Sequence, residues 1–524
     1  MALIEALLDP GAYPHPVERV ELLETHISWV LLTGPYAYKI KKPVNLGFVD
    51  FTTLERRRHF CQEELRLNRR LAPALYDAVV PVLGPAERPR IGQPGSGGEG
   101  EVIELAVRMH QFPQENLLPA ALARGAVDGP CLDRLALDLA RFQGAAACPG
   151  PQESYGSAAA VLAPVEANFL ALEAATALRP RLEALERWSH SRFEELAALL
   201  PQRRQAGRVR ECHGDLHLGN MALLEGRITV FDALEFSPAL RWVDVISEMA
   251  FLVMDLQQSG CSGFANRLRN RWLEWCGDYH GLRLWRWYAA YRALVRAKVG
   301  VLRALQRHPD PLQEADTTAM VESYVALAET QGQSRPRALV LTHGVSGSGK
   351  SHHSLGLCEQ LELIRLRSDV ERKRLAGLWG EPRPTAIAGD LPLYGEAMDR
   401  LLFEHHLPEQ VEATLAGGYT ALVDATFLRR EQRLAWAQRA AQWGVPLVIL
   451  SFDTPPELAR QRIAQRRAAG HDPSDADEAV LEQQWSRLEP LDAKERTVAL
   501  PVRPDQEPAE TAAALRKRLG EGLP

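Results

Sequence analysis

Residues 338–351 read Ala-Leu-Val-Leu-Thr-His-Gly-Val-Ser-Gly-Ser-Gly-Lys-Ser, and this stretch decides the fold of the C-terminal third of the chain. An apolar run, 338–343, leads into the pattern G-x-x-x-x-G-K-S, and a helical pattern follows over 352–363. A strand, a glycine-rich turn and a helix N-terminus in this order hold phosphates, because backbone N–H groups and the helix dipole face the anion. The stretch therefore predicts a nucleotide phosphate site rather than a simple tight turn.

Each position of this loop has an expected task. The Lys350 ammonium is expected to reach the β- and γ-phosphates of ATP, and the Ser351 hydroxyl to bind Mg²⁺. The glycines let successive backbone N–H groups turn towards the phosphates. The other predicted phosphate-binding residues are Gly344, Ser346, Gly347, Ser348 and Gly349.

Strand-like and helical patterns alternate after residue 337. Such alternation is typical of a mainly parallel α/β sheet, here the sheet of a P-loop module over 338–524. The segment 331–337 (QGQSRPR) follows a helical region and is the predicted linker between modules. The expected strands are 338–343, 362–367, 420–424, 445–452 and 497–502.

Charged residues downstream of the loop suggest kinase chemistry. Asp369 follows a predicted strand and is the candidate base for an acceptor hydroxyl, with Arg372 holding an anionic substrate; the alternative for Asp369 is a helix N-cap. Asp424 ends an apolar run and either orders Mg²⁺ or caps a strand end. Arg462 and Arg466 are four residues apart, so they either close over the phosphates from one helical face or belong to a solvated basic helix.

Residues 336–510 resemble the small P-loop kinases of the polynucleotide-kinase, zeta-toxin and gluconate-kinase type. The S-D-x-x-R element of polynucleotide kinases corresponds to Ser368, Asp369 and Arg372, and their D-x-T element to residues 424–426. Ala425 stands where those enzymes usually carry a polar residue, which weakens the implication of nucleic-acid-end specificity.

A second constellation lies before the linker, in His213-Gly-Asp-Leu-His-Leu-Gly-Asn220 and Asp232. Phosphoryl transfer needs a carboxylate beside the acceptor hydroxyl and further oxygen ligands that hold Mg²⁺ against the phosphates. Asp215 is the predicted base, and Asn220 and Asp232 are the predicted metal ligands. His213 and His217 have no second ligand pair at zinc spacing, so they are expected to hydrogen-bond the loop.

The H-G-D-x-x-x-x-N motif followed by an apolar run and Asp resembles the aminoglycoside phosphotransferase and choline kinase group of protein-kinase-like folds, over residues 20–330. The resemblance implies that Lys39 contacts phosphate and pairs with Glu64, with Lys41 and Glu63 as the alternatives. It also implies that residues 108–110 form the hinge that faces adenine.

Two departures from that family concern the same module. The turn Leu32-Thr-Gly-Pro35, predicted between the first two strands, has no G-x-G-x-x-G pattern. Glu235 follows Asp232 where the family carries an aromatic or glycine ending, and it either joins the metal site or orients the loop.

For the whole chain, these patterns predict an α+β protein-kinase-like module followed by an α/β P-loop module. A β-rich lobe is expected over 1–112 and a helical lobe over 113–330; Gly84–Glu101 is expected to be a long hairpin loop. A helix is expected over about 53–72, and Asp244 is expected to cap a helix that follows it.

Composition narrows the class of protein. The 524 residues suffice for three or four structural units at roughly 150 residues each, and the net charge of −6 disfavours a general nucleic-acid coat protein. Seven cysteines without a CxxC pair indicate neither a disulfide scaffold nor a zinc ribbon. The absence of a basic leader and of long apolar runs predicts a cytoplasmic protein without a membrane partner.

These patterns together predict a bifunctional ATP- and Mg²⁺-dependent phosphotransferase, with both modules acting on hydroxyls of small molecules. Two alternatives stay open: a P-loop module that phosphorylates a polynucleotide or nucleotide 5′-hydroxyl, or one module that senses nucleotide and regulates the other. Nucleic acid is the less favoured partner, and the sequence indicates neither the acceptors nor the oligomeric state.

Overall fold

The computed structural model describes residues 2–47, 49–95, 100–306, 311–382, 384–389, 391–469 and 477–520. Its packing divides the chain into two compact units, each built from separate segments. The first comprises Met1–Cys131, Ala146–Val161 and Pro201–Glu248, and the second comprises Leu132–Ala145, Leu162–Leu200 and Met249–Pro524. Helices before residue 331 therefore pack with the P-loop segment, while the module boundaries drawn from the sequence stay a prediction.

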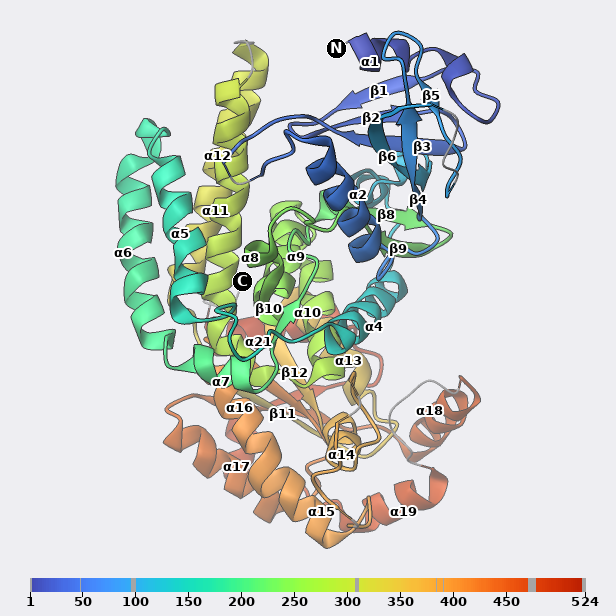
Figure 1. Ribbon diagram of the computed structural model, residues 1–524. Helices are drawn as coiled ribbons and strands as arrows, with labels where there is room; N and C mark the ends of the chain where they lie inside the picture. The colour runs from blue at the N-terminus through green and yellow to red at the C-terminus, as the bar shows by residue number, and fades with distance from the viewer. Residues whose placement is uncertain are drawn as a thin grey trace. The chain divides into compact units, whose positions relative to one another are not determined.

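An antiparallel sheet of order β1-β2-β3-β6-β4-β5 forms the N-terminal part of the first unit (Figure 1). Along β3 the side chains alternate, so Tyr38 and Ile40 join the apolar core while Lys39 and Lys41 share the other face. The predicted kinase-like sheet is thus present. Its strands are β1 (Glu21–Glu24), β2 (Ser28–Leu32), β3 (Tyr36–Lys41), β4 (Tyr76–Leu83), β5 (Arg90–Ile91) and β6 (Val102–His110).

Strand β1 was not predicted, because its four side chains are all exposed and lack the alternation that marks a half-buried strand. The turn Leu32–Pro35 therefore joins β2 to β3 and does not join the first two strands. The true first turn is residues 25–27, which Thr25 closes by donating its N–H to the Ser28 carbonyl at 2.9 Å. It contains no glycine either.

The segment Gly84–Glu101 connects β4 and β6, which pair as the predicted hairpin. It also contributes β5, a short strand paired with the end of β4; residues 96–99 of this loop lie outside the described residues. Helix α2 (Leu54–Asn68) packs on β4 and β6 and begins after Thr53, whose hydroxyl accepts the Arg56 N–H at 3.2 Å. It ends four residues earlier than expected.

The rest of the first unit contains two small antiparallel sheets, whose strands lie around the predicted motif of residues 213–232. One pairs β7 (Val209–Glu211) with β10 (Trp242–Asp244), and the other pairs β8 (Met221–Leu224) with β9 (Arg227–Val230). Asp244 accepts the Ile246 N–H at 2.9 Å directly before α9 (Val245–Gln258), so its predicted capping role is confirmed. Shorter helices here are α1 (Ala2–Ala6), α3 (Leu118–Ala123), α7 (Leu199–Gln205) and α8 (Pro238–Arg241).

The second unit contains a parallel sheet of order β12-β13-β11-β14-β15, as predicted. Every residue of the first three strands in that order is buried, which matches the continuous apolar runs typical of strands covered on both faces. The strands are β11 (Leu339–His343), β12 (Leu363–Arg367), β13 (Thr420–Asp424), β14 (Leu447–Phe452) and β15 (Ala499–Val502).

Helices α13 (Lys350–Gln360) and α21 (Pro508–Leu519) pack against one another and share a buried apolar cluster with the sheet. Helix α10 (Ser262–Cys276) packs on α13 and on β12 in the same unit. The remaining helices lie in this unit, except that α4 and α5 begin in the first; they are α4 (Gly129–Ala145), α5 (Ala158–Leu172), α6 (Arg179–Leu196), α11 (Leu282–Gln306), α12 (Pro311–Gly332), α14 (Ser368–Leu375), α15 (Glu396–Arg400), α16 (Leu407–Ala416), α17 (Arg430–Gln442), α18 (Pro456–Ala469), α19 (Glu478–Arg487) and α20 (Ala493–Val498).

The described helices differ from membrane spans in length or in apolar character. No single helix among them has both the length and the apolar character to cross a bilayer, while the bent pair Ala158–Leu172 and Thr176–Leu196 meets both criteria jointly.

Candidate functional sites

Lys39 lies in a buried ion cluster of the first unit. Its ammonium is 2.8 Å from a Glu64 oxygen and 2.5 Å from an Asp232 oxygen. The predicted Lys39–Glu64 ion pair is therefore present, whereas Glu63, the alternative, pairs with Arg66. Burial by itself lowers the pKa of Lys39, but Asp232 and Glu64 raise it well above its ordinary value, so the lysine stays charged.

Lys41 belongs to the same cluster and shares Glu64 with Lys39. Its ammonium is 2.8 Å from the second Glu64 oxygen and also contacts Glu235. Both the Lys41 and the Glu64 side chains are fully buried. Burial raises the pKa of Glu64, and the two lysines lower it to about 2, so the carboxylate is ionised at neutral pH. The Glu235 side chain is thus engaged by Lys41, which favours the loop-orienting interpretation over metal binding.

The loop that contains Asp215 is closed by its own side chains. The Asn220 amide donates to the Asp215 carboxylate and to the Asp215 carbonyl, both at 3.0 Å. His213 contacts the Phe231 carbonyl at 2.9 Å through Nε2 and accepts the Asp215 N–H through Nδ1, and His217 Nδ1 accepts the Gly219 N–H. The expectation that both histidines hydrogen-bond the loop is confirmed.

The β8–β9 hairpin places Asn220 beside the start of the Asp232 loop. Glu225 and Gly226 both have positive φ, as a two-residue hairpin turn requires, and the Phe231 N–H donates to the Asn220 carbonyl at 2.9 Å. Asp232 itself has φ +62°, a conformation that aspartate tolerates better than most residues. The hairpin therefore explains why two predicted metal ligands twelve residues apart meet.

Three supporting residues escaped the sequence analysis. The Tyr76 hydroxyl accepts the Asp232 N–H at 3.2 Å, and the Asn68 side chain accepts the Ala233 N–H at 2.8 Å. Glu248 accepts the backbone N–H groups of His213 and Gly214 at 2.5 and 3.1 Å. These contacts join segments far apart in sequence, so no local pattern marks them.

The predicted hinge, residues 108–110, forms the last three residues of β6. Arg108 is bound to Asp77 and lies 4.7 Å from the Tyr36 ring centroid, and the His110 ring lies 5.2 Å from the same ring. Its adenine-facing role stays a prediction.

In the second unit, the predicted phosphate loop joins β11 to α13. Gly344, Gly347 and Gly349 have φ values of +148°, +77° and +98°. A Cβ on Gly347 would lie 2.5 Å from the Ala459 carbonyl oxygen, and one on Gly344 would lie 2.9 Å from the Phe452 carbonyl oxygen. Positions 344 and 347 therefore require glycine, because the loop packs closely against neighbouring backbone. Loops that bind phosphate oxygens through backbone N–H groups have the same requirement.

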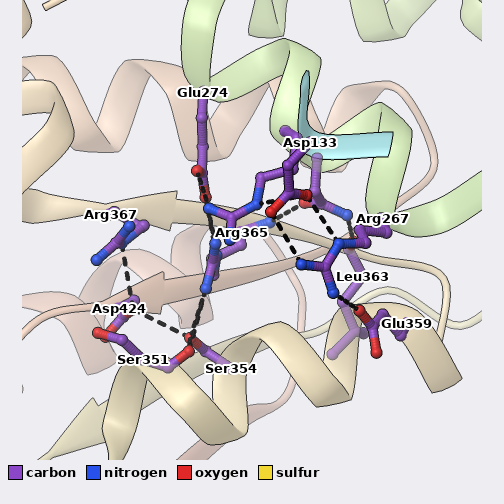
Figure 2. A network of polar contacts seen from close by, with 12 residues as sticks. Asp133, Arg267, Glu274, Ser351, Ser354, Glu359, Leu363, Arg365, Arg367 and Asp424 are labelled. Carbon is purple, nitrogen blue, oxygen red and sulfur yellow. Dashed lines mark hydrogen bonds and ion pairs between the residues drawn. The ribbon is translucent and has the colours of Figure 1, made fainter. Parts of the chain in front are cut away.

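Lys350 and the metal-side residues lie at the base of this loop. The Lys350 ammonium donates to the Val345 carbonyl at 2.6 Å. Asp424 ends β13 and accepts a hydrogen bond from the Ser354 hydroxyl at 3.0 Å (Figure 2). Ser354 lies about one helical turn after Ser351 on α13. A hydroxyl and a carboxylate are the hard oxygen donors that suit Mg²⁺, so the residues fit the cation that accompanies a nucleotide.

A cavity of about 1340 Å³ opens in front of this loop. It brings the loop together with the predicted acceptor residues Asp369 and Arg372. Asp369 is the second residue of α14, whose N-cap is Arg367, so the N-cap alternative for Asp369 is wrong. Arg372 is bound to Asp399 at 2.6 Å and lies over the Tyr394 ring.

Arg462 and Arg466 are the two arginines predicted to close over the phosphates. Arg462 donates to the Ser348 carbonyl at 3.3 Å and to the Pro504 carbonyl at 2.9 Å, so it lies against the phosphate loop. The side chain of Arg466 lies outside the described residues. Gln484, which the sequence analysis missed, accepts the Ser346 N–H at 2.7 Å from α19.

Comparison with known proteins agrees with this division of motifs. Residues 50–285 match the phosphotransferase enzyme family, and residues 339–491 match the AAA domain. Uncharacterized proteins of Mycobacterium bovis and Mycobacterium tuberculosis are each 27% identical over 499 residues, which cover 92% of this chain and 95% of theirs.

Solved structures match each part separately. An amicoumacin kinase in complex with AMP-PNP, Ca²⁺ and Ami is 16% identical and covers 62% of this chain and 92% of its own, with a TM-score of 0.38. A Janibacter sugar kinase is 21% identical and covers 35% of this chain and 95% of its own, with a TM-score of 0.26. By the family models, the chain thus contains a segment similar to the phosphotransferase enzyme family, followed by a segment similar to the AAA domain.

Proposed function

We propose that the chain is a bifunctional ATP-dependent phosphotransferase, in which both modules transfer the γ-phosphate of ATP to a hydroxyl of a small molecule. The proposal is supported by one observation: each module brings together a candidate base, a cation and oxygen atoms that could bind a metal. In the first, Asp215 is bonded to Asn220, and Lys39 reaches Asp232. In the second, Lys350, Asp369 and Asp424 line one cavity.

The same chemistry is proposed for both sites. Asp215 or Asp369 takes the proton of the acceptor hydroxyl while the acceptor oxygen bonds to the γ-phosphorus; the bond between that phosphorus and the β–γ bridging oxygen breaks, and ADP leaves. Lys39 and Lys350 offset charge on the phosphate oxygens, and Arg462 does so at the loop. Mg²⁺, when bound, would neutralise the β- and γ-phosphate oxygens.

ATP turnover tests the proposal directly. We would compare the full chain with Asp215→Ala, Lys350→Ala and the double variant, with and without a metabolite mixture. Two working kinases predict that each single variant loses a separate part of the turnover and that different metabolite fractions stimulate the two parts. A loss of about a hundredfold or more is expected for each affected part, because Asp215→Ala removes a general base and Lys350→Ala removes a cation that offsets phosphate charge.

The alternatives make different predictions in the same assay. If Lys350→Ala abolishes all turnover while Asp215→Ala changes nothing, the first module is a binding or regulatory domain and the bifunctional proposal fails. If single-stranded nucleic acid with a free 5′-hydroxyl, rather than any small metabolite, stimulates the Lys350-dependent part, the acceptor proposal fails for that module. Lys42→Ala serves as a control, because Lys42 pairs with the exposed Glu24.

A further inference from the structure

Glu274 on α10 forms a buried ion pair with Arg365 on β12. One oxygen of Glu274 accepts from the Arg365 guanidinium at 3.0 Å through Nε and at 2.5 Å through Nη2 (Figure 2). The other accepts from Arg271 at 2.9 Å. Burial raises the pKa of Glu274, and Arg365 and Arg271 lower it to about 2, so the carboxylate is charged.

The other edge of the same guanidinium faces the phosphate loop. Arg365 Nη1 donates to the Ser351 carbonyl and to the Ser354 hydroxyl, both at 3.2 Å. Ser354 in turn donates to the Asp424 carboxylate at 3.0 Å. One arginine therefore lies between Glu274 and the residues that would hold the metal, as Figure 2 shows.

The charge of Arg365 has to be balanced because its side chain is only 1% exposed. Glu274 supplies that balance on one side of the guanidinium, while Asp424 is linked to the other side through Ser354. Arg367 already lies 3.8 Å from Asp424. Without Glu274, the Arg365 charge would be left to Asp424, where it would compete with a divalent cation.

We propose that Glu274 is a positioning residue for the P-loop site, which holds the Arg365 charge away from Asp424 so that this carboxylate stays available to the nucleotide-bound cation. The proposal rests on the proposed function of that site. It makes α10, a helix that lies outside the segment matching the AAA domain, a working part of the P-loop module.

The test is the Mg²⁺ dependence of nucleotide binding by the full chain. A fluorescent ADP analogue is titrated with and without Mg²⁺ against the wild type, Glu274→Gln and Lys350→Ala. Glu274→Gln keeps the side-chain shape and removes the charge. We expect Mg²⁺ to strengthen binding about tenfold less in Glu274→Gln than in the wild type, while metal-free binding changes less than about twofold.

A charge-balanced double variant separates positioning from simple loss of packing. In Glu274→Gln/Arg365→Gln both charges are gone, so Arg365 no longer competes for Asp424, Arg367 stays as in the wild type, and the Mg²⁺ effect should return towards that of the wild type. The matched control is Glu359→Gln, which removes another ion pair of α10, the one between Arg267 and Glu359 of α13, while Arg267 keeps Asp133. It should leave the Mg²⁺ effect unchanged.

The results distinguish a failure of the positioning role of Glu274 from a failure of the proposed function of the P-loop site. An unchanged Mg²⁺ effect in Glu274→Gln, or no recovery in the double variant, overturns the positioning role. If Glu274→Gln does not fold, the double variant still decides: it must fold and show the wild-type Mg²⁺ effect. Nucleotide binding by Lys350→Ala that equals the wild type would instead overturn the proposed function of the site.

Discussion

Lys41 shows how one buried cation can join two carboxylates of a site. Its ammonium pairs with the Glu235 carboxylate, and it also shares Glu64 with Lys39. Lys41→Met would leave part of this carboxylate charge buried without a partner. We expect it to lower the free energy of unfolding by about 3–5 kcal/mol, measured by denaturant titration.

The same denaturant titration, repeated at acid pH, shows how the free energy of unfolding depends on the charge of Glu64. The pKa of Glu64 is about 2, below its ordinary value of 4.5, so its ion pairs stabilise the folded chain above pH 4.5 and that contribution is lost as the pH falls towards 2. Lys41→Met should therefore flatten the loss of stability between pH 5 and 2. Lys42 directly follows the strand and lowers the pKa of the exposed Glu24, so Lys42→Met should change the slope less than Lys41→Met does; equal effects of the two variants would contradict the role of Lys41.

At the scale of elements, the phosphate loop is shaped by the helix packed behind it. Gly347 combines φ +77° with a Cβ position 2.5 Å from the Ala459 carbonyl of α18, so Gly347→Ala must both strain the backbone and displace the helix. The left-handed backbone alone accounts for about 1–2 kcal/mol.

Gly444→Ala is the matched control for this prediction. Gly444 has φ +65° and no atom within 4 Å of its Cβ position, so it isolates the backbone contribution. Gly347→Ala should lower the thermal midpoint more than Gly444→Ala and should weaken nucleotide binding, which Gly444→Ala should not. The steric argument fails if calorimetry gives the two variants the same midpoint.

At the scale of the whole molecule, the packing of α10 on α13 and β12 bears on where the chain can be cut. A fragment of residues 338–524 lacks Glu274 and exposes Arg365 and its apolar neighbours. We expect this fragment to unfold at a lower temperature than a fragment of residues 249–524, which keeps the helix, in thermal scans of both. Equal midpoints would mean that the P-loop segment is stable by itself, as the predicted linker at 331–337 implies.

Local sequence signals were enough to predict the two motifs, the five strands of the parallel sheet and, through the family resemblance, the pairing of Lys39 with Glu64. Each of these rests on a local signal: an apolar run, a glycine spacing or a family motif. Tertiary structure alone decided that Lys41 and Glu235 join the first cluster, that Gln484 reaches the phosphate loop, and that α10 packs with the P-loop segment. Such contacts join residues far apart in the sequence, so no local pattern encodes them; in the folded chain, buried charges need counter-charges and buried N–H groups need acceptors.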